Sequence, residues 1–243
     1  MKQIAILINL FMILHLTALG FEYPEISITA KSLNDFVPKN WKLLKSSKGD
    51  INNDKIIDLV FVLEYTDNAT ITRSSKDFNG NQIIDSLDSK PRILVITTFD
   101  PAKGYYRKIE QSNLFIPCEY EGGGQNSDIF EGLIIRNQLI VITIYSMSGV
   151  HSQTNYKFKI VNNEVVLVGY EESTTYRISG DFEELIFYFK SKKVKIVTGN
   201  VESKKQEISW KTLHLPPKLR LKDFSNPFSM RVEGENSFNI SLD

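Results

Sequence analysis

Cysteine is almost absent from this chain of 243 residues, since Cys118 is the only one. A single cysteine excludes any intramolecular disulfide, so the fold has to be stable without covalent cross-links. Aromatic residues are plentiful instead, with 15 phenylalanines and 10 tyrosines. Their large apolar side chains can supply the buried surface that a core without disulfides requires.

Histidine is also scarce, and this limits the chemistry available to the chain. Of the three histidines, His15 falls in an N-terminal apolar segment, which leaves His151 and His214. Two histidines without a His-Glu-x-x-His pattern do not indicate a typical zinc site. Cys118 with either histidine as base is a conceivable nucleophile, but a lone cysteine after an apolar strand is more typical of a small buried residue. We therefore predict no catalytic residues.

An excess of charge of either sign is missing as well. The 29 basic residues balance the 29 acidic ones, so no global field attracts nucleic acid or an anionic membrane surface. No local basic patch stands out in the sequence. We expect no nucleic-acid partner and predict instead an unknown protein or glycan partner.

The only long apolar run lies at the N-terminus. Lys2 supplies a positive charge, an apolar stretch follows, and Ala18-Leu19-Gly20 offers small residues where cleavage is determined. This pattern predicts a cleaved signal peptide over residues 1–20, and hence an exported protein, periplasmic or secreted. An uncleaved membrane anchor is the competing interpretation, but Asn9 and His15 interrupt the run, which is shorter than the roughly 20 residues of a span.

Residues 21–243 are predicted to form a single all-β domain, an antiparallel meander of about ten strands in packed or propeller-like twisted sheets. The run from Leu59 to Leu63 has no polar break, which indicates a strand covered on both faces. Asn137-Gln138 and Asn162-Asn163 each separate two apolar runs, and asparagine tolerates the positive φ of hairpin turns. The last dozen residues have few apolar anchors, and we expect this tail to fray.

One stretch carries a definite chemistry, the acidic loop from Gly49 to Leu59. Oxygen-bearing side chains alternate along it just before the apolar strand. Calcium takes six to eight oxygen ligands from carboxylates, amides and backbone carbonyls. The predicted calcium ligands are Asp50, Asn52, Asp54, the carbonyl of Ile56 and Asp58. The alternative is a turn rich in Asn and Asp that is held by its own side-chain-to-backbone bonds and binds no metal.

The pattern Asp50-x-Asn52-x-Asp54-x-x-x-Asp58 resembles the calcium loop of integrin-α-type FG-GAP and VCBS repeats. It differs from an EF-hand, because Phe61 stands where that loop needs a glutamate. In the repeats it resembles, the residue after the third ligand is usually glycine, which allows a left-handed backbone. Here that residue is Lys55, and keeping the same geometry implies strain of about 1–2 kcal/mol. The order of segments along the chain also resembles a group of uncharacterised exported bacterial β proteins, which implies no activity.

The stretch from Tyr65 to Pro91 is polar and predicts a long excursion from the sheet. Asp77, Asn79, Asn81 and Asp85 lie within it and repeat the spacing of the acidic loop. They form either a second, weaker metal loop or a coincidence of turn-rich composition. Coincidence is favoured, because the stretch offers two carboxylates and no apolar strand follows it.

These patterns together predict an exported, calcium-stabilised, non-enzymatic binding or interaction protein whose calcium is structural. Two alternatives stay open. The acids around the glycine-rich loop from Glu119 to Asp128 could serve an exported hydrolase. The chain could instead be a periplasmic inhibitor or immunity-type protein that contacts its partner through residues 65–91.

Overall fold

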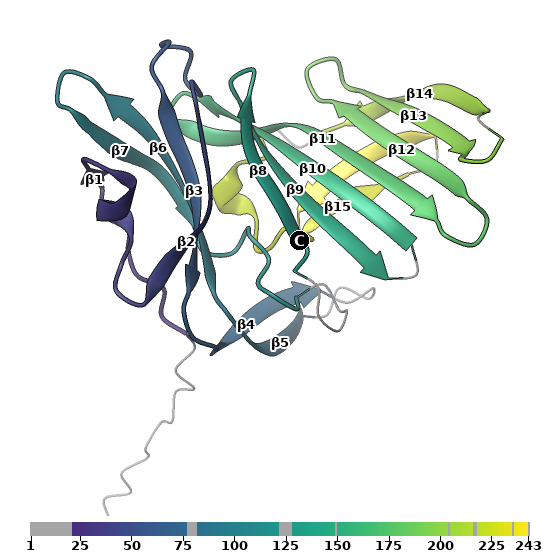
Figure 1. Cartoon of the computed structure of the whole chain (residues 1–243). Coiled ribbons are helices and arrows are strands. Elements are labelled where there is room, and N and C mark those ends of the chain that lie inside the picture. Colours follow the sequence, from purple (N-terminus) through teal and green to yellow (C-terminus); the bar gives the residue numbers. More distant parts are fainter. Residues whose placement is uncertain are drawn as a thin grey trace, which may run out of the picture.

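The structure is a computed structural model that describes residues 21–76, 82–121, 128–148, 150–203, 205–215, 218–234 and 236–242. The predicted signal peptide, residues 1–20, lies outside the described residues. Sixteen strands and two short 3-10 helices make up the described chain (Figure 1). The all-β prediction is confirmed, although strands outnumber the ten expected. No helix in the described part is long and apolar enough to cross a membrane.

A five-stranded antiparallel sheet forms the N-terminal side of the molecule (Figure 1). We call it the small sheet. Its order is β1-β7-β6-β3-β2, so β3 lies between two hydrogen-bonded neighbours. Its strands are β1 (Thr29–Ala30), β2 (Trp41–Gly49), β3 (Asp58–Tyr65), β6 (Arg92–Asp100) and β7 (Tyr105–Ser112).

Strand β3 is buried on both faces, as its unbroken apolar run predicts. Val60 and Val62 point into the main core, which lies between the small sheet and the nine-stranded sheet described below. Phe61 and its alternate neighbours point into a second core beneath residues 21–37. There η1 (Leu33–Phe36) places Phe36 against Phe61, with ring centroids 5.5 Å apart.

A nine-stranded sheet forms the rest of the molecule, and we call it the large sheet. Strands β8 to β14 follow one another as an antiparallel meander. Both predicted hairpin turns are present, with φ of 51° and 62° at Asn137 and Gln138, and of 52° and 62° at Asn162 and Asn163. The meander contains β8 (Phe130–Arg136), β9 (Leu139–Ser148), β10 (Val150–Val161), β11 (Glu164–Tyr176), β12 (Asp181–Tyr188), β13 (Lys193–Asn200) and β14 (Gln206–His214).

The C-terminal segment folds back over the large sheet instead of fraying. Strand β16 (Ser237–Leu242) runs parallel to β14 and antiparallel to β15 (Met230–Glu233). Phe238 reaches Phe187 of β12, with ring centroids 5.8 Å apart, and Ile240 is buried. Phe238, Ile240 and Leu242 alternate along the strand, so one face of a polar tail still carries apolar anchors.

The two sheets are packed together and do not form a propeller. A propeller needs separate small blades around an axis, whereas nine strands here form one continuous sheet. Phe115, after β7, lies at the centre of the main core. Its ring is 5.1 Å from those of Tyr156 and Phe158 and 5.3 Å from that of Phe224, which follows η2 (Leu221–Asp223). Apolar burial between sheets and tail therefore replaces the missing disulfides.

The edges of the two sheets meet where β2 approaches β8. The Ile135 N–H donates to Ser47 Oγ at 2.8 Å, and Lys45 Nζ bonds the carbonyl of Glu131. Gly49 makes the approach possible, because a Cβ on it would lie 2.6 Å from Ile135 Cγ2.

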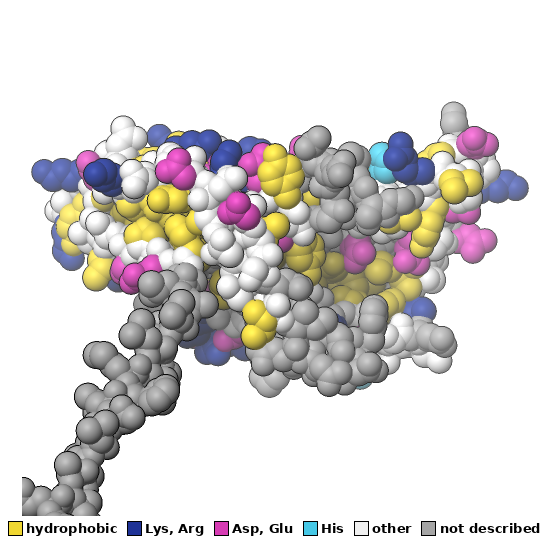
Figure 2. All heavy atoms as spheres, turned by 90° about the horizontal axis from the view of Figure 1, so that it is seen from below, with side chains coloured by type: hydrophobic (Ala, Val, Ile, Leu, Met, Phe, Trp, Pro, Cys, Tyr) yellow, Lys and Arg dark blue, Asp and Glu magenta, His cyan; other side chains and the backbone are white. Residues whose placement is uncertain are grey.

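The predicted excursion from Tyr65 to Pro91 contains a hairpin of its own. Strands β4 (Ala69–Lys76) and β5 (Gln82–Ser89) form a separate two-stranded sheet. It is drawn below the small sheet and the large sheet in Figure 1. Ile71 is 2% exposed, so one apolar side chain anchors a polar hairpin. Viewed from below, acidic and basic side chains are interspersed among apolar ones (Figure 2), in keeping with the balanced charge.

Candidate metal centre

The acidic loop connects β2 to β3. Asp50 follows the last residue of β2, Asp58 is the first of β3, and Gly49 pairs with Asp58 in the ladder. The Asp58 side chain is fully buried. The strands therefore hold both ends of the loop in fixed positions.

Three carboxylates gather in this loop. Asp50, Asp54 and Asp58 each offer an oxygen, and these oxygens all lie within 4.8 Å of one another. Among the described residues, no ion pair involves any of the three. Like charges this close repel one another, and a divalent cation between them would turn repulsion into attraction.

Backbone N–H groups orient the carboxylates. Asp50 Oδ1 accepts the Asn53 N–H at 2.6 Å, and its Oδ2 accepts the Lys55 N–H at 2.9 Å. Asp54 Oδ1 accepts the Ile56 N–H at 2.8 Å. These bonds fix the oxygens in place. Asp50 Oδ1 also accepts the Asp54 N–H at 3.2 Å, whereas Asp50 Oδ2 and Asp54 Oδ1 each keep a second lone pair. The same bonds would also hold a turn without metal.

The two remaining predicted ligands are placed less directly. Asn52 Oδ1 accepts the Asp54 N–H at 3.1 Å, and Asn52 Nδ2 donates to Asp54 Oδ2 at 2.7 Å. The Ile56 N–H donates a hydrogen bond to Asp54 Oδ1. The structure thus brings three of the five predicted ligands together and hydrogen-bonds the other two residues to one of them.

Lys55 has a left-handed backbone conformation. Its φ is 68°, and that of Asn53 is 67°. Asparagine visits this left-handed region readily, whereas lysine pays a steric penalty there. Lysine thus has a left-handed backbone here, at the position where the similar repeats have glycine.

Burial raises the pKa of Asp58 above its ordinary value, and the nearby charges of Asp54 and Asp50 add to the effect. Two N–H groups act against the shift, from Ile51 at 3.0 Å and from Phe99 at 2.9 Å. A bound cation would also oppose it, because positive charge favours the carboxylate.

A contact from the large sheet reaches the loop. Gln138 Nε2, in the β8–β9 turn, donates to Asn53 Oδ1 at 2.7 Å. The sequence offers no signal for this contact, since the two residues are 85 positions apart. It joins the acidic loop to the far side of the sheet junction.

The possible second metal loop cannot be compared with the first. Asp77, Asn79 and Asn81 lie outside the described residues, and Asp85 falls in β5. The repetition of spacing therefore remains a prediction.

The acids proposed for a hydrolase are held separately, each by a different cation. Glu121 binds Arg73 at 2.8 Å, Glu119 binds Lys90 at 3.4 Å, and Asp128 binds Arg92 at 2.6 Å. Each pair anchors a chain segment. Each of these carboxylates is thus engaged in an ion pair.

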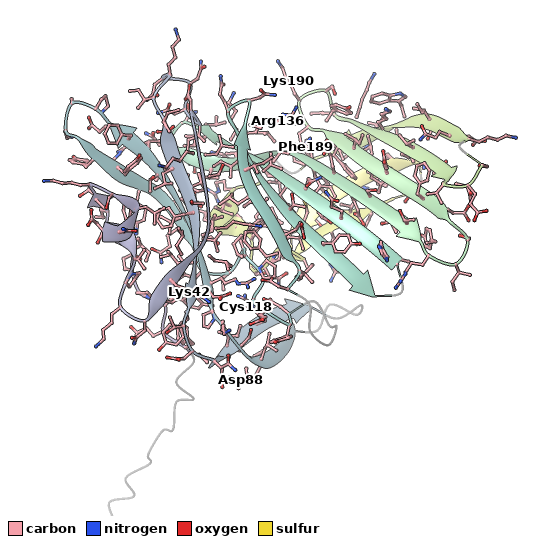
Figure 3. All side chains as sticks on the ribbon, viewed as in Figure 1. Lys42, Asp88, Cys118, Arg136, Phe189 and Lys190 are labelled. Atoms are coloured by element: carbon pink, nitrogen blue, oxygen red, sulfur yellow. The ribbon has the colours of Figure 1, made fainter. Side chains whose placement is uncertain are left out.

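Cys118 lies buried where the β4–β5 hairpin meets the small sheet (Figure 3). Burial raises the pKa of its thiol to about 12. A thiol with so high a pKa is protonated at neutral pH and is a poor nucleophile. His151 is engaged elsewhere, with Nδ1 2.6 Å from the Tyr145 hydroxyl.

Arg92 is a buried charge whose role the sequence did not suggest. Its side chain is 1% exposed, contacts Glu64 and Asp128 at 2.6 Å each, and donates to the carbonyl of Pro117 at 2.8 Å. The sequence signal that could have pointed to this role is the position of a charged residue directly before the apolar run from Ile93 to Ile96. The network ties β3, β6 and the segment before β8 together.

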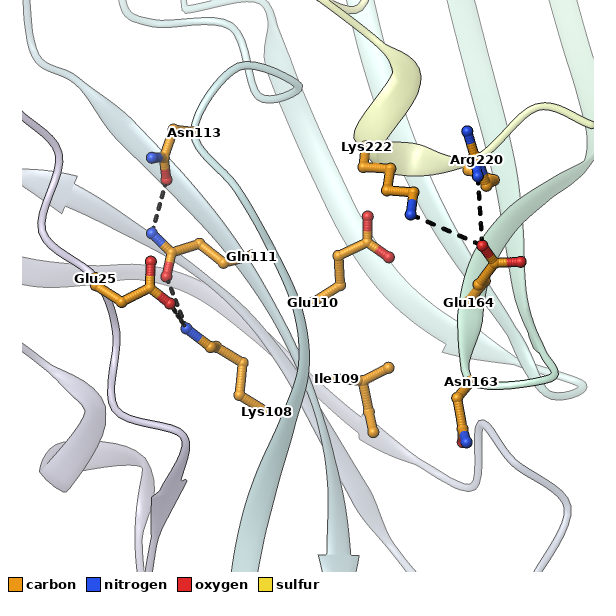
Figure 4. Close-up of a pocket in the computed structure, with 10 residues that line it drawn as sticks. All are labelled: Glu25, Lys108, Ile109, Glu110, Gln111, Asn113, Asn163, Glu164, Arg220 and Lys222. Carbon is orange, nitrogen blue, oxygen red and sulfur yellow. Dashed lines mark hydrogen bonds and ion pairs between the residues drawn. The ribbon is translucent and has the colours of Figure 1, made fainter.

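A pocket of about 430 Å³ lies where β7 meets the β10–β11 turn (Figure 4). Glu110 accepts the Val165 N–H at 3.3 Å through Oε2, while its buried Oε1 has no hydrogen-bond partner among the described residues. Burial raises the pKa of Glu110. Lys222, which also lines the pocket, is 3.8 Å from Glu164, and its charge and backbone partly oppose the rise in the pKa of Glu110.

Comparison of the chain with family models, with curated proteins and with solved structures gave no match.

Proposed function

We propose that the chain is an exported, non-enzymatic interaction protein whose acidic loop binds one structural calcium ion. The observation that carries the calcium site is the convergence of three carboxylates in the loop between β2 and β3. Calcium suits such a set because it accepts flexible arrangements of many oxygens, whereas magnesium demands a strict octahedron. The backbone carbonyl of Ile56, the Asn52 amide and water would complete its shell.

A structural role is favoured over a catalytic one by the location of the loop. It links a doubly buried strand to a turn of the large sheet through Gln138. The loop contains no histidine, and calcium activates water less effectively than zinc does. Export rests on the sequence pattern of residues 1–20 alone.

Thermal unfolding in calcium and in chelator tests the proposal. At a free calcium concentration ten times the dissociation constant, binding adds about 1.4 kcal/mol of stability, and this raises Tm by about 3–6 °C for a chain of this size. Titration calorimetry should show one site. Unchanged melting together with no heat of binding would exclude the calcium site.

A charge-matched pair of variants locates the effect. Asp54→Asn removes one of the three clustered carboxylates, and we expect it to abolish the stabilisation by calcium. Asp67→Asn removes an exposed carboxylate just beyond β3, and the response to calcium should persist. Equal responses of the two variants would move the metal away from the acidic loop.

An inhibitor or immunity-type role is a second candidate, favoured by the separate β4–β5 hairpin. The hairpin is anchored midway along β4 by the ion pair of Arg73 with Glu121, both 10% exposed at the side chain, while Ile84 is 65% exposed. Replacing residues 69–89 by a short turn should abolish capture of a partner from a periplasmic extract. An unchanged set of captured proteins would contradict this role.

A further inference from the structure

One face of the large sheet is left open by the fold. Strands β9 to β14 turn alternate side chains toward the main core, and the tail covers that side. The opposite face carries Tyr188 and Trp210, which are 43% and 54% exposed and have ring centroids 5.7 Å apart. Exposed aromatic pairs of this kind are typical of binding surfaces.

Two adjoining pockets form a groove beside this aromatic pair. One, of about 550 Å³, includes Gly169 and Tyr188 on the open face. The other, of about 360 Å³, extends toward Leu215 and Leu219. They share Val168, Phe189 and Lys190, and Phe189 and Lys190 lie at the same end of the sheet as Arg136 (Figure 3). We call the combined feature the β11–β12 groove.

The β11–β12 groove has an apolar floor and basic walls. Four lysines line it, and its one acidic residue, Glu171, is ion-paired with Lys157. Lys218 is paired with Glu164. Within the described part of the chain, Lys159 and Lys190 have no carboxylate partner. The unbalanced charge of the groove is therefore positive.

A β-bulge in β11 lies at the centre of the groove. Lys157 pairs with Gly169 and Phe158 pairs with Leu167, so Val168 is an extra residue in a bulge. The ladder to β12 begins only at Gly169. The bulge bends β11 where both pockets include Val168, and beside it the Leu167 N–H donates to the carbonyl of Leu219 at 2.8 Å.

We infer that the β11–β12 groove binds an extended acidic peptide segment with apolar side chains. Carboxylates of the peptide pair with Lys159 and Lys190, and apolar side chains enter the two pockets that meet at Val168. Two linked pockets fit successive side chains of a chain better than one compact ligand. This inference rests on the proposed interaction role and is independent of calcium.

Fluorescence anisotropy with three short labelled peptides tests the inference. The first alternates glutamate with leucine and phenylalanine, the second has lysine for glutamate, and the third has serine for the apolar residues. We expect saturable binding of the first and at least tenfold weaker binding of the others. No saturable binding of the first peptide up to about 1 mM, or equal binding of all three, would overturn the inference.

Two variants locate the site. The double variant Lys159→Glu and Lys190→Glu should weaken binding of the acidic peptide at least tenfold and favour the lysine peptide. Lys31→Glu with Lys39→Glu makes the same charge change at exposed positions on the N-terminal segment and should leave binding unchanged. Equal losses in both double variants would show non-specific charge attraction and overturn the site.

A third variant fills the groove. A Cβ on Gly169 would meet Lys157 Cδ at 3.4 Å, an ordinary contact, so Gly169→Ala should fold and, because it narrows the groove, weaken binding severalfold. Vesicles of anionic phospholipid serve as a competing probe, and binding to vesicles but to no peptide would overturn the inference. All arms are run with calcium and with chelator, so that a failure of the calcium site is distinguishable from a failure of the groove.

Discussion

The small sheet and the large sheet differ in how many of their faces are buried. The small sheet is covered on both faces, by the large sheet on one side and by residues 21–37 on the other. The described residues cover the large sheet on one face, and exposed aromatic residues such as Trp210 lie on the other. The difference separates two tasks: the first sheet can hold a loop rigidly, whereas the second can present a surface.

The largest effect on stability is expected when a core residue of the small sheet is compared with a residue on the open face of the large sheet. Phe61→Ala removes a ring that is 0% exposed and should lower the free energy of unfolding by about 3–5 kcal/mol. Ile134→Ala, on β8 at 52% exposed, should cost below about 1 kcal/mol. Denaturant unfolding measures both, and comparable losses would mean that the open face is covered in solution.

The junction between the sheets should respond next most strongly. Gly49→Ala forces a Cβ to within 2.6 Å of Ile135 Cγ2, and we expect a loss of about 1–3 kcal/mol. Gly132→Ala is the control, because its nearest contact would be Thr143 Cβ at 3.8 Å. If the two variants unfold at the same denaturant concentration, the close approach of β2 and β8 is wrong.

A smaller, stabilising effect is expected in the acidic loop. Lys55→Gly relieves a φ of 68°, and after the entropy of the unfolded chain is counted it should add about 0.5–1 kcal/mol. Lys48→Gly, in β2 with no positive φ, should instead lose about 0.5–1 kcal/mol. Thermal melts in chelator measure both, and destabilisation by Lys55→Gly would contradict the loop geometry.

The smallest effect concerns pH at the pocket where the sheets meet. Because the pKa of Glu110 is raised in the folded protein, the folded state holds more protons, and stability falls as pH rises from about 4.3 through the folded pKa. Glu110→Gln should flatten this decline and should not reduce stability at pH 7. A decline as steep as in the unchanged protein would assign it to another carboxyl, such as Asp58, whose pKa is also raised.

Local patterns predicted most of the strands because their signals are short-range. The apolar run from Leu59 to Leu63 predicted a strand buried on both faces, and the asparagines at 137 and 162 predicted two hairpin turns. The spacing of the acidic loop likewise predicted which carboxylates would converge. In each case the physical cause lies within about a dozen residues.

Long-range packing accounts for what the sequence did not reveal. The tail was expected to fray because Phe238 and Ile240 are sparse anchors, yet they find partners on β12 and in the main core. The Arg92 network and the contact of Gln138 with the acidic loop join residues far apart in the chain. No local periodicity in the sequence predicts contacts between residues so far apart in the chain.

The return of the C-terminal segment over the large sheet bears on how the chain is made. Synthesis delivers the meander first, and Phe187 can gain its contact with Phe238 only when the last strand emerges. Until then the nascent chain displays apolar surface to which chaperones and proteases bind. Clipping of the tail would recreate that state, so loss of a few residues should mark the whole protein for degradation.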